Sequence, residues 1–264
     1  MDFAKFYNEQ PDYAAFRTDK VKREEYTITV DWKARKLSQL IPEGLVFNNI
    51  LEIGCAFGVL LNNIADRLSI KTRTGIDISN ENIKLAKNIF PNCDFFAGTL
   101  EDYLKLIPAK ADNSRFELVI LSDIVEHIPD DLTFMKRVSE ISSFVLFNLP
   151  LEKCFRNRNR NYGENDSSGH LRCYDKKMAI QLVNQAGFEI VDSINIVAIS
   201  DEQFFEMYKG NRKLRIHSKP LPLRIFWTIF YALEDRIRLS GSKISEKIYG
   251  TNYFALLKSN SSKM

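Results

Sequence analysis

The stretch that decides the fold is Ile50–Leu61, ILEIGCAFGVLL. Apolar residues run up to Gly54, and a second apolar segment follows Gly58, so the stretch predicts a strand, a tight turn and a helix. The two glycines let the backbone turn sharply and approach a ligand closely. Ala56 stands where a dinucleotide-binding G-x-G-x-x-G turn has its second glycine, so the turn is a poor match for a pyrophosphate.

Outward from this turn, short apolar strands alternate with helical patterns. Strands are expected at 49–53, 72–76, 93–96, 116–121, 144–148, 188–197 and 253–258, and helices at 59–68, 80–90, 100–106, 131–141 and 175–186. Alternation at this spacing predicts right-handed crossovers and an α/β fold with a doubly wound, mostly parallel sheet covered on both faces. A polar loop is expected over 151–173.

The chain divides into four expected parts. Residues 1–45 form an N-terminal helical lead-in, 46–198 the core, 199–250 a helical cap inserted before the last strand, and 251–264 the last core strand and tail. The insertion carries six basic residues beside the apolar run Leu223–Leu233, LRIFWTIFYAL. Basic residues beside aromatics are typical of a helix lying on an anionic membrane. A run that is apolar nearly all round favours a helix packed on its own domain, which is the preferred interpretation.

Composition sets the broad class. A formal net charge of +3, with 45% hydrophobic and 27% charged residues, is ordinary for a globular protein and makes nucleic acid an unlikely partner. The four cysteines form no C-x-x-C pair, which argues for a reducing compartment. The N-terminus lacks a signal-peptide core, and no run reaches the roughly 18 apolar residues of a membrane span. We expect a cytoplasmic protein of open oligomeric state, with peripheral contact at the inner membrane surface as an alternative.

A carboxylate follows the second predicted strand. Asp77, in TGIDIS, lies 19 positions after Gly58, close to the spacing of about 20 expected for a carboxylate that binds a ribose diol. Four motifs then stand in order: EIGCAFG (52–58), GIDIS (75–79), FAGTLED (96–102) and LSDIVEHIPD (121–130). Together they resemble the class I S-adenosylmethionine-dependent methyltransferases over about residues 48–197.

The resemblance implies S-adenosylmethionine as cofactor and methyl transfer to an O or N nucleophile. It places the amino-acid end of the cofactor on the glycine turn and its ribose on Asp77. The adenine would lie beside Ile78, and its amine beside Thr99 and Leu100. Members often carry an acid at position 99, so Glu101 or a backbone carbonyl is expected to take that role. The full cofactor set so implied is Glu52, Gly54, Cys55, Ala56, Gly58, Asp77, Ile78, Thr99, Leu100 and Ser122.

An acid–histidine cluster, Asp123 to Asp130, follows the apolar strand at 116–121, so it is expected near the reactive methyl. Histidine titrates near neutrality and can take a proton from a nucleophile. His127 and His170 are therefore candidate catalytic residues, with Glu126 orienting; alternatively, these side chains merely bound the pocket. The cluster also resembles the metal site of small-RNA 2′-O-methyltransferases and, in part, of ubiquinone-pathway O-methyltransferases. That resemblance implies Mg²⁺, Mn²⁺ or Zn²⁺ on Asp123, Glu126, His127 and His170.

The acceptor is the least determined feature. Arg156, Arg158 and Arg160 lie on the polar loop, where arginine forks suit phosphate or carboxylate, although a solvated charged loop is equally compatible. Few aromatics are available to stack on RNA. We expect a small-molecule or saccharide biosynthetic intermediate, anionic or lipid-linked. The alternatives are a nicotinamide-dependent oxidoreductase and a non-catalytic, membrane-associated binding protein on the same fold.

Overall fold

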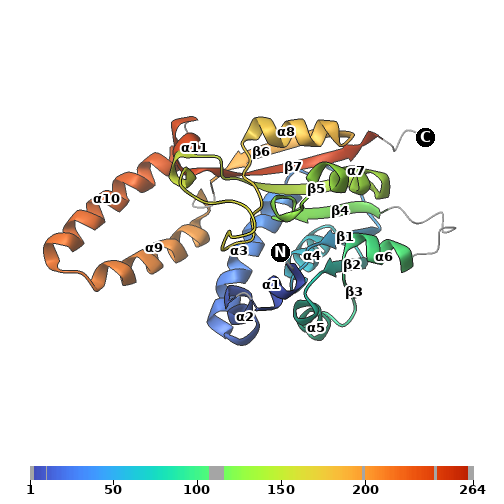
Figure 1. The fold of residues 1–264 in the computed structure, drawn as a ribbon, viewed down its shortest axis with the longest axis horizontal. Coiled ribbons are helices and arrows are strands. Elements are labelled where there is room, and N and C mark those ends of the chain that lie inside the picture. Colours follow the sequence, from blue (N-terminus) through green and yellow to red (C-terminus); the bar gives the residue numbers. More distant parts are fainter. Residues whose placement is uncertain (1–2, 10, 107–115, 198–199, 241–242, 261–264) are drawn as a thin grey trace.

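The computed structural model describes residues 3–9, 11–106, 116–197, 200–240 and 243–260. Within these ranges seven strands form one sheet in the order β3-β2-β1-β4-β5-β7-β6 (Figure 1). Strand β7 is antiparallel to both neighbours, and the remaining pairs are parallel, which confirms the predicted α/β fold. The strands are β1 (Asn49–Ile53), β2 (Thr72–Asp77), β3 (Asp94–Ala97), β4 (Phe116–Ser122), β5 (Ser142–Leu151), β6 (Phe188–Ile196) and β7 (Thr251–Ser259).

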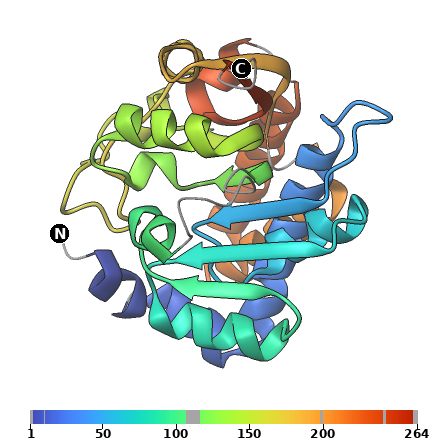
Figure 2. The same cartoon turned by 90° about the vertical axis from the view of Figure 1, so that its right-hand side faces the viewer.

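Helices cover both faces of the sheet, as the view from the end of the molecule shows (Figure 2). The alternation along β4 explains why: Leu118 and Ile120 pack into one core cluster, while Val119 and Leu121 pack into the other. All four side chains are fully buried, as expected of a parallel strand between two helical layers. One layer contains α4 (Val59–Arg67) and α5 (Asn80–Ile89); the other contains α6 (Leu100–Leu106), α7 (Asp131–Ile141) and α8 (Lys176–Gln185).

The lead-in consists of α1 (Phe3–Glu9), α2 (Pro11–Thr18) and α3 (Lys20–Ser38). Helix α3 is part of the core rather than an appendage, because Trp32, Ala34 and Leu37 are buried in the same cluster as Ile50 of β1. The lead-in is therefore fixed to the sheet and can contribute side chains to a site at the sheet's edge.

The glycine turn joins β1 to α4. Gly54 and Gly58 have φ of +78° and +74°, a region that favours glycine, and a Cβ on Gly58 would lie 2.6 Å from the ring of Phe95. The backbone N–H groups of Gly54 and Cys55 both donate to the carbonyl of Ile76, at 2.8 and 3.0 Å. The turn is thereby held against the end of β2, where Asp77 lies.

The insertion between β6 and β7 contains α9 (Glu202–His217), α10 (Leu221–Leu239) and α11 (Lys243–Tyr249). Helices α9 and α10 form a hairpin that projects from the body of the molecule (Figure 1). Ile229 and Leu233 on α10 are 58% and 56% exposed. The preferred expectation, a helix whose apolar surface packs on its own domain, is wrong for these residues. The side chains buried in the hairpin are polar ones, among them Arg212 of α9 and Glu234 of α10, which form an ion pair.

Candidate active site

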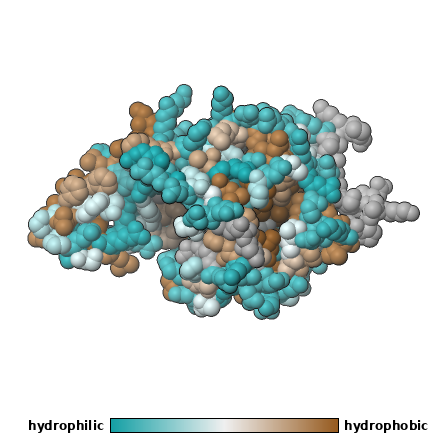
Figure 3. All heavy atoms as spheres, in the orientation of Figure 1, coloured by the Kyte–Doolittle hydropathy of each residue, from teal (hydrophilic) through white to brown (hydrophobic). Residues whose placement is uncertain are grey.

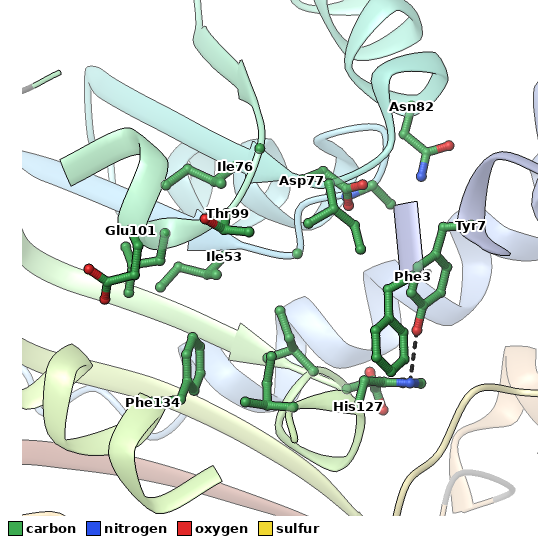
Figure 4. A pocket seen from close by; sticks show the side chains of 18 of the residues that line it. Phe3, Tyr7, Ile53, Ile76, Asp77, Asn82, Thr99, Glu101, His127 and Phe134 are labelled. Atoms are coloured by element: carbon green, nitrogen blue, oxygen red, sulfur yellow. Dashed lines mark hydrogen bonds between the residues drawn. The ribbon is translucent and has the colours of Figure 1, made fainter. Parts of the chain in front are cut away.

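A cavity of about 310 Å³ opens at the carboxyl ends of β1, β2 and β4. The strand order reverses direction between β1 and β4, and ligands of open α/β sheets bind outside the strand ends at such a point. Figure 4 shows Asp77 and His127 facing this cavity from different elements. The lining includes Phe3, Tyr7, Gly54, Ala56, Asp77, Ile78, Asn82, Thr99, Leu100, Glu101, Asp123, Ile124, His127 and Phe134.

Six of the expected cofactor residues line the cavity: Gly54, Ala56, Asp77, Ile78, Thr99 and Leu100. The other four, Glu52, Cys55, Gly58 and Ser122, are not among the lining residues. Glu52 is buried and accepts a hydrogen bond from the N–H of Leu61 at 2.9 Å, which ties β1 to α4. Burial raises the pKa of Glu52 well above its usual range. The structure thus gives Glu52 a supporting position rather than one on the cavity wall.

Asp77 braces the glycine turn. Its two carboxylate oxygens accept hydrogen bonds from the N–H groups of Ser79 and Ala56, each at 2.8 Å. Burial raises the pKa of Asp77, and these two N–H groups offset part of that rise. Since each carboxylate oxygen has a second lone pair, the group can accept further hydrogen bonds from a ligand in the cavity.

Thr99 has a helix-capping role as well as a place in the lining. Its hydroxyl donates to the carboxylate of Asp102 at 2.7 Å and lies 3.2 Å from the N–H of the same residue, at the start of α6. Glu101, the expected substitute for an acid at position 99, also lines the cavity.

Asp123 is paired with a cation from the lead-in. The ammonium of Lys33 on α3 donates to its carboxylate, and the hydroxyl of Ser122 and the amide of Asn148 donate to the same oxygen at 2.9 and 3.1 Å. Burial acts to raise the pKa of Asp123, but Lys33, together with Ser122 and His127, holds that pKa below its usual value. The residue has φ of +52°, a strained conformation for a non-glycine residue beside a ligand cavity.

The two histidines meet beside the cavity, with ring centroids 4.7 Å apart. Nδ1 of His127 lies 2.9 Å from the carbonyl of Gly169 and 2.8 Å from the hydroxyl of Tyr7. Nδ1 of His170 lies 2.7 Å from the carboxylate of Glu152. Burial, followed by the proximity of His170, lowers the pKa of His127 to about 4, so this imidazole is neutral at physiological pH. In both rings Nε2 is the atom left to meet a ligand.

Glu126 is the least satisfied side chain of the site. It lies in the short helix η1 (Val125–His127) and is 1% exposed, yet neither carboxylate oxygen has a hydrogen-bond partner among the described residues. One of them lies 3.8 Å from Nε2 of His127. Burial raises the pKa of Glu126 well above its usual range, because a buried carboxylate needs a proton or a cation to offset its desolvation.

Three of the four residues implied as metal ligands therefore meet. One ligand atom from each of Glu126, His127 and His170 lies within 4.8 Å of the others. Asp123 is not part of this group, because its carboxylate is engaged by Lys33. The oxygen and nitrogen donors of the other three fit a divalent cation of the type expected.

The loop arginines make internal ion pairs. Arg160 binds Asp166 at 2.7 Å and Glu152 at 2.8 Å, and Arg156 binds Glu234 of α10 at 2.6 Å. The guanidinium of Arg158 stacks on the ring of Phe155, 4.0 Å from its centroid. These arginines are not among the residues that line the cavity, so they give no support to an anionic acceptor.

Sequence reasoning missed Tyr7, Lys33 and Glu152. Each acts through a long-range contact: Tyr7 meets His127 across 120 positions, and Lys33 meets Asp123 across 90. Local pattern contains no signal for such pairs. The aromatic residues of the lead-in were visible in the sequence, but their partners were not.

The sheet order and the cavity at the switch point define a Rossmann-like fold, with the carboxylate of Asp77 in the cavity where a ribose-binding residue is expected. The methyltransferase domain family matches residues 24–193, and the chain belongs to that family. The family match argues against the nicotinamide-dependent oxidoreductase that the sequence left open as an alternative.

Individual relatives agree with this assignment. The chain is 30% identical over 103 residues to the ubiquinone biosynthesis O-methyltransferase of Pseudoalteromonas translucida, a match that covers 38% of this chain and 41% of the relative. The chain thus spans about two fifths of the length of this curated relative.

Two solved structures share the fold. One is the plantazolicin methyltransferase BamL with S-adenosylhomocysteine (TM-score 0.56, 13% identity, 98% and 94% of the two chains). The other is phosphoethanolamine N-methyltransferase 2 of Haemonchus contortus with S-adenosyl-L-methionine (TM-score 0.61, 11% identity, 98% and 60%). At these identities the likeness concerns the fold alone.

Proposed function

We propose that the chain transfers the methyl group of S-adenosylmethionine to an oxygen or nitrogen nucleophile of a small molecule at the His127 end of the cavity. The observation that carries this is the placement of Asp77 and His127 on one cavity (Figure 4). The carboxylate suits the ribose hydroxyls, and the neutral imidazole suits an acidic hydrogen on the nucleophile. S-adenosylmethionine would supply the methyl group and leave as S-adenosylhomocysteine, with the electron pair of the broken bond on its sulfur, and Nε2 of His127 would accept the proton of the nucleophile. In-line placement supplies most of the acceleration.

The acceptor side of the cavity is largely apolar. Phe3, Ile124, Ile128 and Pro129 line it near His127. Together with the ion pairs of the loop arginines, this favours a hydroxyl carried on a mainly apolar frame over the saccharide expected from sequence. The printed name of the curated relative, an O-methyltransferase of ubiquinone biosynthesis, supports an oxygen nucleophile.

Labelled methyl transfer tests the proposal. The protein is incubated with cell-extract metabolites and deuterium-methyl S-adenosylmethionine, and mass spectrometry identifies the compound that gains the label. With that acceptor, His127→Gln should lower kcat about a hundredfold or more while leaving the affinity for S-adenosylhomocysteine unchanged. His217→Gln is the matched control, because His217 is exposed on α9. Equal activity of the two variants would exclude His127 from the chemistry.

The partnerless carboxylate of Glu126 favours a second candidate, metal-assisted methyl transfer. Glu126, His127 and His170 would hold the cation, and the carbonyl of Gly169 and the carboxylate of Glu152 would fix the two imidazoles for it. A bound divalent cation would lower the pKa of an acceptor hydroxyl and hold its oxygen. In this arrangement Nε2 of His127 binds the cation instead of receiving the proton.

Elemental analysis separates the two candidates. After dialysis against a metal-free buffer and reloading, the metal-assisted candidate requires about one equivalent of Mg, Mn or Zn. Glu126→Gln and His170→Gln should lose that metal, and His217→Gln should keep it. Full activity of a metal-free protein in excess chelator would leave His127 as the proton acceptor and end the metal proposal.

A further inference from the structure

The α9–α10 hairpin, residues 202–239, has its apolar face outside. Ile225, Phe226, Ile229, Phe230 and Leu233 lie on one side of α10 and are each 45–58% exposed. Figure 3 shows this apolar surface, in brown, along the projecting hairpin. A helix of a globular protein normally turns such a stripe toward the core. A contiguous exposed apolar stripe usually marks an interaction site.

A buried polar seam fixes the hairpin in this orientation. Arg212 of α9 is 7% exposed and pairs with Glu234 at 2.7 Å and Asp235 at 2.6 Å on α10. Arg156 of the loop reaches the other oxygen of Glu234 at 2.6 Å. The guanidinium of Arg212 also donates to the hydroxyl of Tyr208 at 2.6 Å. Rotating α10 to bury its apolar face would break this network and leave buried charges unpaired, which is strongly unfavourable.

The turn between α9 and α10 and the helix ends beside it, called the basic turn below, are rich in Lys and Arg. Between Asn211 and Leu233 the sequence has five Lys and Arg residues and no Asp or Glu. Lys213, Arg215 and Lys219 are exposed, and they make no ion pair within the described part of the chain. An apolar stripe beside exposed, uncompensated cations is the composition of a helix that lies in the interface of an anionic bilayer.

The hairpin leaves the body at the edge of the sheet that holds the cavity. Strand β6 is antiparallel to β7, and β7 is antiparallel to β5, so β6 runs in the same direction as β5. The insertion therefore begins at the carboxyl edge, where the cavity opens. A surface that bound the hairpin would lie on the same side of the molecule as the active site.

We propose that the α9–α10 hairpin docks on the surface of a bilayer containing anionic phospholipids. The stripe enters the boundary between headgroups and acyl chains, and the basic turn contacts the headgroups. Within the residues that the structure describes, no helix is long and apolar enough to cross a membrane, so the contact is peripheral. The apolar stripe alone would suit a second copy of the chain equally well; the unpaired cations of the turn select an anionic surface instead.

Vesicle co-sedimentation of the full chain tests this. Binding to vesicles of phosphatidylcholine with 30% phosphatidylglycerol should exceed binding to pure phosphatidylcholine by about tenfold or more, and it should weaken in high salt. Phe226→Ser/Phe230→Ser should lose binding by a similar factor. Lys213→Glu/Arg215→Glu should lose only the preference for the anionic vesicles.

Matched controls change similar side chains elsewhere: Val46→Ser for exposed apolar surface and Lys71→Glu/Lys87→Glu for exposed charge. Circular dichroism and the affinity for S-adenosylhomocysteine should match wild type in every hairpin variant, because these side chains are exposed and lie outside the cavity lining. Equal binding to both vesicle types, or unaltered binding of the Phe226/Phe230 variant, would overturn the proposal. So would a dimer in light scattering that this variant dissociates, since the stripe would then belong to a second copy.

Discussion

Replacing Asp77 by Asn tests the proposed ribose contact by removing its charge and one of its two acceptor oxygens. In the free protein the carboxylate accepts N–H groups from Ala56 and Ser79, each at 2.8 Å, on different oxygens. The amide of Asn has one acceptor oxygen, so one of these N–H groups would face an NH₂ group instead. The ribose would also lose a charge-assisted hydrogen bond, which contributes about 1.5–3 kcal/mol. With about 1.4 kcal/mol per tenfold, the dissociation constant should rise ten- to a hundredfold.

Calorimetric titration with S-adenosylhomocysteine measures this change directly. Asp102→Asn is the matched control, because Asp102 caps the next helix through Thr99 and does not line the cavity. Its dissociation constant should stay close to that of wild type. A dissociation constant for Asp77→Asn within twofold of wild type would refute the reasoning, and so would an equal loss in Asp102→Asn, since the effect would then be one of general stability.

Three further changes probe the turn, the core and the hairpin's anchor. Gly54→Ala should lower the free energy of unfolding by about 1–3 kcal/mol and weaken cofactor binding, because φ is +78° and the new Cβ would lie 2.6 Å from the side chain of Ile124. Gly44→Ala is the matched control: φ is +85°, but no atom lies near the new Cβ, so only the stability should change. Leu121→Ala should lower the free energy of unfolding by about 2–5 kcal/mol in urea denaturation, and a loss below 1 kcal/mol would contradict its full burial. Asp201 caps α9 and pairs with Arg35 of α3 at 2.9 Å. Burial acts to raise the pKa of Asp201, but these contacts together hold it below its usual value. Its stabilising effect is thus present above about pH 4 and lost as pH falls further, so the stability gap between wild type and Asp201→Asn should close in acid and persist at pH 7.

The parts of the fold that sequence predicts are those that local pattern encodes. The run FELVIL becomes β4 because apolar residues on both faces suit a strand between two helical layers. The glycine turn and Asp77 follow from spacing along adjacent strands. The cofactor side of the site is built from such local features, which is why six of ten expected residues line the cavity.

The hairpin could not be predicted in the same way. Hydropathy shows that α10 is apolar, but it does not say which face turns inward. That is decided by Arg212 and Glu234, which lie 22 positions apart on different helices. The arginines of the loop were ambiguous for the same reason: Arg156 has its partner on α10. From sequence alone, charged residues are expected on the surface of the protein. Only the fold shows which of them form ion pairs with one another.

The same division applies to the range of the family match. The family match spans residues 24–193, which contain the glycine turn, Asp77 and both histidines of the site. Tyr7, which contacts His127 from α1, lies before that range, and the α9–α10 hairpin lies after it. The cofactor half of the enzyme therefore rests on the shared core. The proposed acceptor side combines His127 of the matched range with Phe3 and Tyr7 of α1, which lie before it, and the exposed apolar stripe lies wholly after it. The family match therefore carries no information on the α1 side of the cavity or on the hairpin.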